Sequence, residues 1–250
     1  MASEKSLAVA GFAQGDSYDA ARPRYPEEAI EHFVATFHLD ERSHVLDLGA
    51  GTGIFARQLL PFVGRLTAVD PSASMRATFA RHTPGVTILE GSDVDIPVAD
   101  GDVAAVFAAQ AFHWFDAAPA LVEMRRVLAT GGGLGLIWNE RDADVPWIRE
   151  LNHAMLWDVH QPYDPHIDFA AIVRRGPFRD VEVAQFRHET VLTHDQIRAR
   201  VVTTSYITLM NDADRDALVG DLTAVLASLP DPVAMPYVTN VFTAFAREPH

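Results

Sequence analysis

The fold is decided by the stretch Val45-Leu46-Asp47-Leu48-Gly49-Ala50-Gly51-Thr52-Gly53, in which an apolar run leads into three alternating glycines. This stretch joins a predicted strand, His44–Leu48, to a predicted helix, Ile54–Leu60. Glycine at such a turn lets a ligand approach the backbone closely, which is typical of ligand sites in α/β sheets. A turn that uses glycine for packing alone is the alternative.

Strand and helix patterns alternate around this turn. The strand candidates are continuous apolar runs, which indicates strands buried on both faces, as in a parallel sheet covered by helices. Gly131-Gly132-Gly133 is predicted to turn the chain into the last of these strands. The further predicted strands are Arg65–Val69, Thr87–Glu90, Val103–Ala108 and Gly135–Trp138, and the further helices are Pro26–Phe37, Ser72–His82 and Ala117–Ala129.

The second half of the chain is less regular. Residues 140–169 suggest a helical insertion with loops, and residues 193–210 and 212–229 suggest helices. Phe178–Thr190 and Val238–Arg247 alternate, which predicts an antiparallel pair at the sheet edge. The predicted fold is α/β: a doubly wound, Rossmann-like sheet of seven strands, mostly parallel with an antiparallel C-terminal edge strand, plus a helical cap. We predict one domain over residues 1–250, with a lid and helix at 1–42, a cofactor-binding core at 43–139, a cap insertion at 140–170 and a C-terminal part at 171–250 that completes the sheet.

The composition excludes several classes of protein. The chain has 250 residues, 20 basic and 34 acidic side chains for a net charge of −14, and no cysteine. Without cysteine there is no disulfide scaffold, cysteine nucleophile or zinc–thiolate site, and the negative charge disfavours nucleic acid as a partner. The longest apolar stretch, Val103–Phe115, contains Gln110 and His113 and is too short to cross a bilayer. With no secretion signal in the sequence, we expect a cytoplasmic protein that binds no membrane.

Two acids define the ligand of the glycine turn. Asp47 precedes the first glycine by two residues, and Asp70 ends the next predicted strand, where an acid accepts hydrogen bonds from ribose hydroxyls. A dinucleotide loop has the spacing G-x-G-x-x-G, whereas this loop has G-x-G-x-G, and Asp47 would add negative charge beside the phosphates. S-adenosyl-L-methionine has no phosphate and carries an ammonium and a sulfonium, so the charges favour it as the cofactor.

With this glycine turn and these two acids, residues 45–138 resemble the class I S-adenosylmethionine-dependent methyltransferases. The resemblance rests on Asp47 to Gly53, on Asp70 and on the tract Gly91-Ser92-Asp93-Val94-Asp95-Ile96-Pro97. It implies that Gly49, Gly51 and Gly53 contact the cofactor, and that Asp93, with Val94 beside it, meets the adenine. A solvated turn acid is the alternative for Asp93.

Ligands of open α/β sheets bind at the carboxyl ends of strands. If S-adenosylmethionine is the cofactor, its methyl group is therefore expected to lie beside the residues that follow the fourth predicted strand, Gln110-Ala111-Phe112-His113-Trp114-Phe115. We assign Gln110 to the cofactor site, and His113 and Trp114 to the acceptor pocket. An imidazole takes up a proton near neutral pH, so His113 is also the candidate base. A buried structural histidine is the alternative for His113.

The sequence is also similar to one branch of this family, the trans-aconitate methyltransferase-like (methyltransferase type 11) branch. This similarity rests on the stretch after the fourth predicted strand, on Tyr18-Asp19-Ala20-Ala21-Arg22-Pro23-Arg24-Tyr25-Pro26 and on Thr204-Ser205-Tyr206-Ile207. This resemblance implies a small-molecule acceptor, in some members a carboxylic acid. It places Tyr206 in the acceptor pocket. It also suggests a lid in which Arg22 pairs with the methionine carboxylate and Tyr18 hydrogen-bonds it, since arginine grips carboxylates with two parallel hydrogen bonds. A proline-stiffened entry to the first helix is the alternative.

We therefore predict in-line methyl transfer to a carboxylic acid or hydroxyl of a small molecule, with release of S-adenosylhomocysteine. A nicotinamide-dependent oxidoreductase and a non-catalytic nucleoside-binding protein are the alternatives. No metal is expected, because His153, His160, His166 and Asp168 lack the spacing of known metal motifs.

Overall fold

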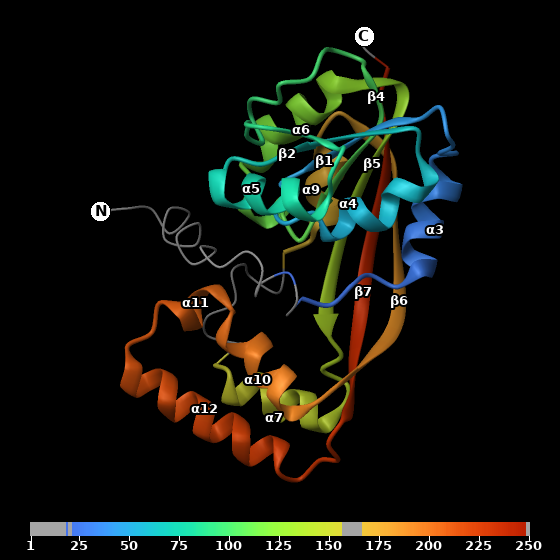
Figure 1. Cartoon of the computed structure of the whole chain (residues 1–250). Coiled ribbons are helices and arrows are strands. Elements are labelled where there is room, and N and C mark those ends of the chain that lie inside the picture. The colour runs from blue at the N-terminus through green and yellow to red at the C-terminus, as the bar shows by residue number, and fades with distance from the viewer. Residues whose placement is uncertain (1–18, 20–21, 157–166, 249–250) are drawn as a thin grey trace. The chain divides into compact units, whose positions relative to one another are not determined.

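The computed structural model of the chain describes residues 19, 22–156 and 167–248 (Figure 1). The chain divides into two compact units. The first, the sheet unit, comprises Arg24–Asn139, His166–Phe186 and Thr239–His250. The second, the helical unit, comprises Met1–Pro23, Glu140–Pro165 and Arg187–Val238. The prediction of a single domain with a lid and a cap stays a prediction.

The seven strands form one sheet in the order β3-β2-β1-β4-β5-β7-β6. The pairs β1–β2, β1–β4, β2–β3 and β4–β5 are parallel, and β7 is antiparallel. This confirms the predicted α/β sheet; the C-terminal strand β7 lies one position inside the edge strand β6. The bounds are β1 His44–Leu48, β2 Arg65–Val69, β3 Thr87–Leu89, β4 Val103–Ala109, β5 Leu128–Arg141, β6 Phe178–Leu192 and β7 Val233–Ala246.

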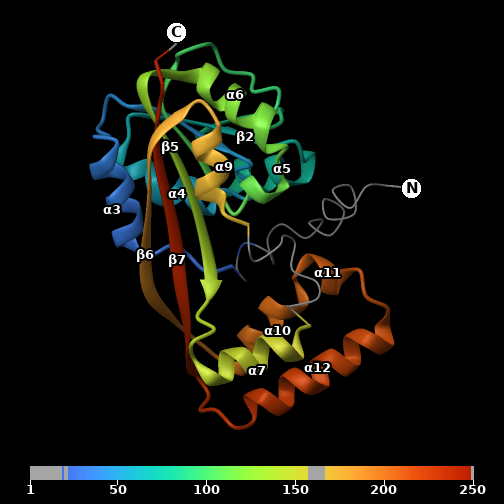
Figure 2. The same ribbon diagram turned by 180° about the vertical axis from the view of Figure 1, so that it is seen from behind.

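Helices cover both faces of the sheet unit. Neighbouring residues on a strand point to opposite faces, and Ile137 of β5 belongs to the core beneath α3, whereas Trp138 stacks on Phe169 of α9. Accordingly, α4 lies in front of the strands in Figure 1 and α9 in front of them in Figure 2. The helices of this unit are α3 Glu27–Thr36, α4 Ile54–Leu59, η1 Leu60–Phe62, α5 Ala73–His82, η2 Phe112–Trp114, α6 Ala117–Val127 and α9 Phe169–Arg175.

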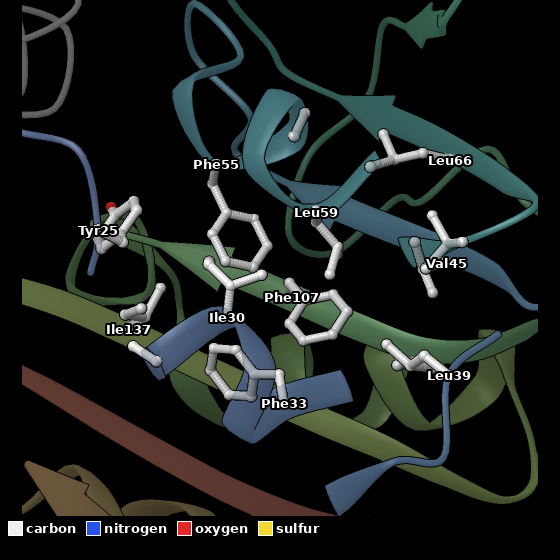
Figure 3. Packing of buried hydrophobic residues seen from close by; sticks show 14 of the residues in the cluster. Tyr25, Ile30, Phe33, Leu39, Val45, Phe55, Leu59, Leu66, Phe107 and Ile137 are labelled. Carbon is white, nitrogen blue, oxygen red and sulfur yellow. The ribbon is translucent and has the colours of Figure 1, made fainter. Parts of the chain in front are cut away.

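The core on the α3 face is aromatic (Figure 3). The rings of Phe33 and Phe55, from α3 and α4, lie 5.1 and 5.2 Å from the ring of Phe107 on β4. All three side chains are almost fully buried. Burial of a large aromatic side chain typically contributes about 1.5–3 kcal/mol, so this cluster fixes α3 and α4 on β4, the neighbour of the strand β1 that leads into the glycine turn.

Strand β5 begins seven residues earlier than predicted, at Leu128 and not Gly135. The glycine triplet is therefore part of the strand, where the register shifts between the pairs Val103–Leu128 and Ala105–Gly133. A Cβ on Gly133 would lie 2.3 Å from the Phe37 ring. Close packing of an aromatic ring, which the turn pattern did not reveal, explains a glycine at this position.

The helical unit has its own apolar core. Its helices are α7 Pro146–Ala154, α10 His194–Val202, α11 Ser205–Thr208 and α12 Asp212–Leu226. Ile148 and Leu151 of α7 pack with Ile197 of α10 and Leu222 of α12, all fully buried. A capping box formed by Thr193 and Gln196 starts α10. Among the described residues, no helix is both long and apolar enough to span a membrane.

Candidate active site

At the carboxyl end of the sheet, one hydrogen bond joins the loops after β1 and β2, and another joins the loops after β3 and β4. The Gly51 N–H after β1 donates to Asp70 Oδ2 after β2, at 2.9 Å. The Asp116 N–H beyond β4 donates to Asp93 Oδ2 after β3, at 2.7 Å. The chain order reverses here, with β2 and β4 on opposite sides of β1. Ligands of open α/β sheets bind at such a reversal point.

The three glycines of the β1–α4 turn have different tasks. All have positive φ, +72° at Gly49, +54° at Gly51 and +87° at Gly53, which favours glycine. A Cβ on Gly49 would lie 2.7 Å from that of Ala111, and one on Gly53 would lie 2.8 Å from Phe79. At Gly51 a Cβ would meet nothing within 4 Å. Packing therefore requires the outer glycines, whereas the middle one borders open space.

Asp70 is buried and oriented at the end of β2. Its Oδ1 accepts a hydrogen bond from the Ser72 N–H at 2.8 Å, and its Oδ2 accepts the one from Gly51. Burial raises the pKa of Asp70, and the two N–H donors and the charge of Arg76 offset part of the rise. Because each carboxylate oxygen accepts more than one hydrogen bond, Asp70 can still serve a pair of ligand hydroxyls.

Asp47 near the end of β1 is 1% exposed, and neither of its carboxylate oxygens has a hydrogen-bond partner among the described residues. Burial and the negative charge of Asp70 raise the pKa of Asp47 to about 7. The Ala56 N–H offsets part of this rise, although its approach falls short of hydrogen-bond geometry. A buried acid without a partner is costly, so such acids are concentrated at functional sites, where a cation compensates them.

The loop after β3 is held against α6. Arg126 donates to the carbonyl oxygens of Ile96 and Val98, at 2.8 and 2.9 Å, and pairs with Glu123 at 2.7 Å. With Asp93 bound to the start of α6, this fixes a loop on which Val94 is half exposed. Both the adenine contact and the turn role predicted for Asp93 are compatible with this position.

The segment after β4 is constrained at Gln110. Its φ of +53° is rare for a residue with a side chain, and such backbone outliers cluster at functional sites. Its N–H donates to the Ile137 carbonyl at 2.9 Å, and its side-chain amide donates to the Asn139 carbonyl at 3.0 Å. These bonds to β5 hold the backbone that carries η2.

His113 and Trp114 lie on η2, with ring centres 4.9 Å apart. Burial lowers the pKa of His113 to about 4, so its imidazole is neutral at physiological pH. The indole Nε1–H of Trp138, on the neighbouring strand β5, donates to His113 Nδ1 at 3.2 Å. The acceptor-pocket candidate His113 therefore has a neutral ring, with the Trp114 ring beside it.

Comparison with known proteins identifies the family. The model of a methyltransferase domain matches residues 46–136. The chain is 34% identical over 228 residues to an uncharacterized methyltransferase of Mycobacterium tuberculosis, which covers 89% of this chain and 90% of the relative. The chain belongs to the class I S-adenosylmethionine-dependent methyltransferases. S-adenosyl-L-methionine is therefore the cofactor of this methyltransferase.

Two further proteins resemble parts or the fold of this chain and say less about its function. The methyltransferase is 30% identical over 151 residues to the malonyl-[acyl-carrier protein] O-methyltransferase of Pectobacterium atrosepticum, which covers 55% of this chain and 60% of the relative. A solved structure assigned as a type II methyltransferase, from Anaeromyxobacter dehalogenans, matches with a TM-score of 0.66 at 24% identity, over 92% of this chain and 99% of the other. The structural likeness shows the fold.

Three predicted site residues of the methyltransferase do not belong to the sheet unit. Tyr18 lies outside the described residues. Arg22 belongs to the helical unit, where it donates to the Thr203 carbonyl at 3.3 Å. In the same unit the Tyr206 hydroxyl donates to the Met155 carbonyl at 2.7 Å, and burial raises its pKa to about 12. The roles predicted for these residues stay predictions.

The sequence pattern did not reveal Trp138 or Arg126 of the methyltransferase as site residues. Trp138 was assigned only to a strand, and Arg126 only to a helix. Each acts through a partner at least 25 positions away, on another element of the sheet unit. Within residues 19, 22–156 and 167–248, no group of three or more acids, histidines or cysteines is arranged to hold a metal ion.

Proposed function

We propose that the methyltransferase esterifies the carboxylate of a small organic acid. The observation that carries this proposal is the neutral, half-buried His113 after the end of β4, which is where an acceptor would meet the methyl group. A carboxylate is already ionised at neutral pH and needs no base, whereas a hydroxyl must lose its proton as it attacks. A histidine with a pKa of about 4 is a weak base.

We infer that the cofactor lies at the carboxyl ends of β1 and β2. The residues there fit it: the unpartnered carboxylate of Asp47 suits an ammonium, and Asp70 has lone pairs for two ribose hydroxyls. Gly51 leaves room for the backbone to be approached. When bound, S-adenosylmethionine supplies a methyl group activated by its sulfonium. The residues of the chain then orient the acceptor in line with it and exclude water.

Two further observations support this choice. The malonyl group in the name of the Pectobacterium relative carries a free carboxylate, so an acid acceptor agrees with that likeness. Membership of the methyltransferase family also favours methyl transfer over the two alternatives, a nicotinamide-dependent oxidoreductase and a non-catalytic nucleoside-binding protein. The likeness to the trans-aconitate methyltransferase-like branch remains part of the proposal.

The test is a panel of small carboxylic acids and phenols, assayed for release of S-adenosylhomocysteine by the full chain. We expect turnover with at least one class of acid and none with phenols. The Asp70→Ala variant serves as the blank, because it lacks the proposed ribose acceptor. Phenols that turn over faster than every acid, at a rate that rises with pH, would overturn the proposal.

A further inference from the structure

The environment of His113 determines which of its ring nitrogens carries the proton. Trp138 Nε1 lies 3.2 Å from His113 Nδ1 in hydrogen-bond geometry. An indole N–H only donates, so Nδ1 must be the acceptor and must carry its lone pair. In a neutral imidazole the single proton then lies on Nε2.

We propose that Trp138 is a positioning residue that holds His113 as the Nε2–H tautomer, so that neither ring nitrogen can take a proton from the methyl acceptor while the bond to Trp138 holds. The consequence for the acceptor rests on the proposed function, but the tautomer itself does not. With Nδ1 engaged by Trp138 and Nε2 protonated, removal of a proton from a hydroxyl would require His113 to break the bond to Trp138.

The packing of Trp138 makes this arrangement rigid. Its side chain is 1% exposed. Its indole stacks on Phe169 at 4.4 Å and 13° and meets Phe242 edge to face at 5.5 Å. Trp114 flanks His113. Because the indole packs against two rings, its N–H could turn away from the imidazole only if the core around it repacked.

Nitrogen-15 spectra of the histidine rings test the proposal on the full chain without acceptor or cofactor. The signals of His113, one of 11 histidines, are identified by their loss in His113→Gln. We expect an unprotonated Nδ1 and a protonated Nε2 at neutral pH. In Trp138→Phe the stacking partner remains but the N–H donor to the neutral ring is lost, so the pKa of His113 should rise by about 0.5–1 unit. The control Trp147→Phe removes an indole N–H in the helical unit and should leave the His113 signals unchanged.

A proton on Nδ1 in the parent chain would overturn the proposal, as would an unchanged His113 pKa in a folded Trp138→Phe variant. Should that variant fail to fold, as judged by circular dichroism, the ring signals of the parent alone decide. Because no turnover is measured, a negative acceptor panel would count against the proposed function only.

Discussion

The two ends of the candidate active site differ in charge. At the ends of β1 and β2 lie two buried acids, Asp47 and Asp70; burial raises the pKa of both, and the charge of Asp70 raises that of Asp47 further. At the end of β4 a half-buried histidine has its pKa lowered by burial, and the uncharged Trp138 donates a hydrogen bond to it. Acidic groups that a cation would ionise are thus concentrated where a cationic cofactor would bind, and a neutral ring lies where an anionic acceptor would bind.

The largest effect is expected from Asp70→Ala. The loss of the carboxylate that we propose to bind the ribose hydroxyls should weaken S-adenosylmethionine binding about 10- to 150-fold, since a hydrogen bond to a charged group contributes about 1.5–3 kcal/mol. Isothermal titration measures it. Asp40→Ala is the matched control, because Asp40 also accepts from the N–H two residues on, at 2.9 Å, but is exposed and outside the site. Equal affinities of the two variants would contradict the assignment.

Gly51→Val should weaken the same ligand by about tenfold or more, because the new side chain enters the open space that borders the turn. The Gly85→Val variant is the control for the backbone strain that a valine causes at a glycine with positive φ. Gly85 has a φ of +86°, and a Cβ there would likewise meet nothing within 4 Å. Both variants therefore carry the backbone cost of a left-handed valine, and only the first should lose affinity in a titration. A loss of the same size in both would show that the turn fails through strain alone.

Asp47→Asn should stabilise the unliganded chain at neutral pH. The pKa of Asp47 is raised from its ordinary value of 3.8 to about 7. The folded state therefore binds more protons than the unfolded state between these values, and its stability falls as the pH rises through this window. We expect the free energy of unfolding of Asp47→Asn to exceed that of the parent by about 1–3 kcal/mol at pH 8, after the cost of a buried amide, with the gap closing below pH 4.

Urea unfolding at several pH values checks this prediction. A variant that is less stable than the parent at pH 8, or a gap that does not depend on pH, would show that Asp47 is not held near neutrality.

The smallest effect is expected at the other end of the site. His113→Gln keeps an N–H donor, so methyl transfer to an acid should stay within about tenfold of the parent, well below the 10²–10⁴-fold contribution of a general base. The rate should also show no rise near a pKa of about 6.5, the ordinary value of histidine. The comparison variant is His113→Leu, which lacks the N–H donor; its KM for the acid should be higher than that of the parent. A steep pH dependence that His113→Gln abolishes would indicate a hydroxyl acceptor with His113 as its base.

The sequence predicted the acidic end of the site better than the neutral end. The bounds predicted for β1 and β2 agree with the structure residue for residue, because each is a short apolar run closed by a glycine or an acid. The link between Gly51 and Asp70 follows from parallel pairing of these two strands. By contrast, the bond between Trp138 and His113 joins residues 25 positions apart that meet only when β4 and β5 pair. No periodicity encodes such a side-chain contact.

The same limit applies to β5 and to the loop after β3. A run of three glycines predicts a turn locally, yet pairing with β4 makes it part of a strand, and the ring of Phe37, about 95 positions earlier, leaves no room for a side chain at Gly133. Arg126 likewise has the pattern of an exposed helix residue, and only the tertiary structure brings it to the carbonyls of Ile96 and Val98.

The most direct test of the account is the number of protons exchanged when S-adenosylmethionine binds at pH 7, measured by isothermal titration in buffers of different ionisation enthalpy. Asp47, with a pKa of about 7, is about half protonated in the free chain. A cation beside it favours the ionised form. The parent should therefore release about half a proton more on binding than Asp47→Asn does. Equal proton exchange in the two chains would contradict the claim that the buried acid pair receives the cofactor's positive charge.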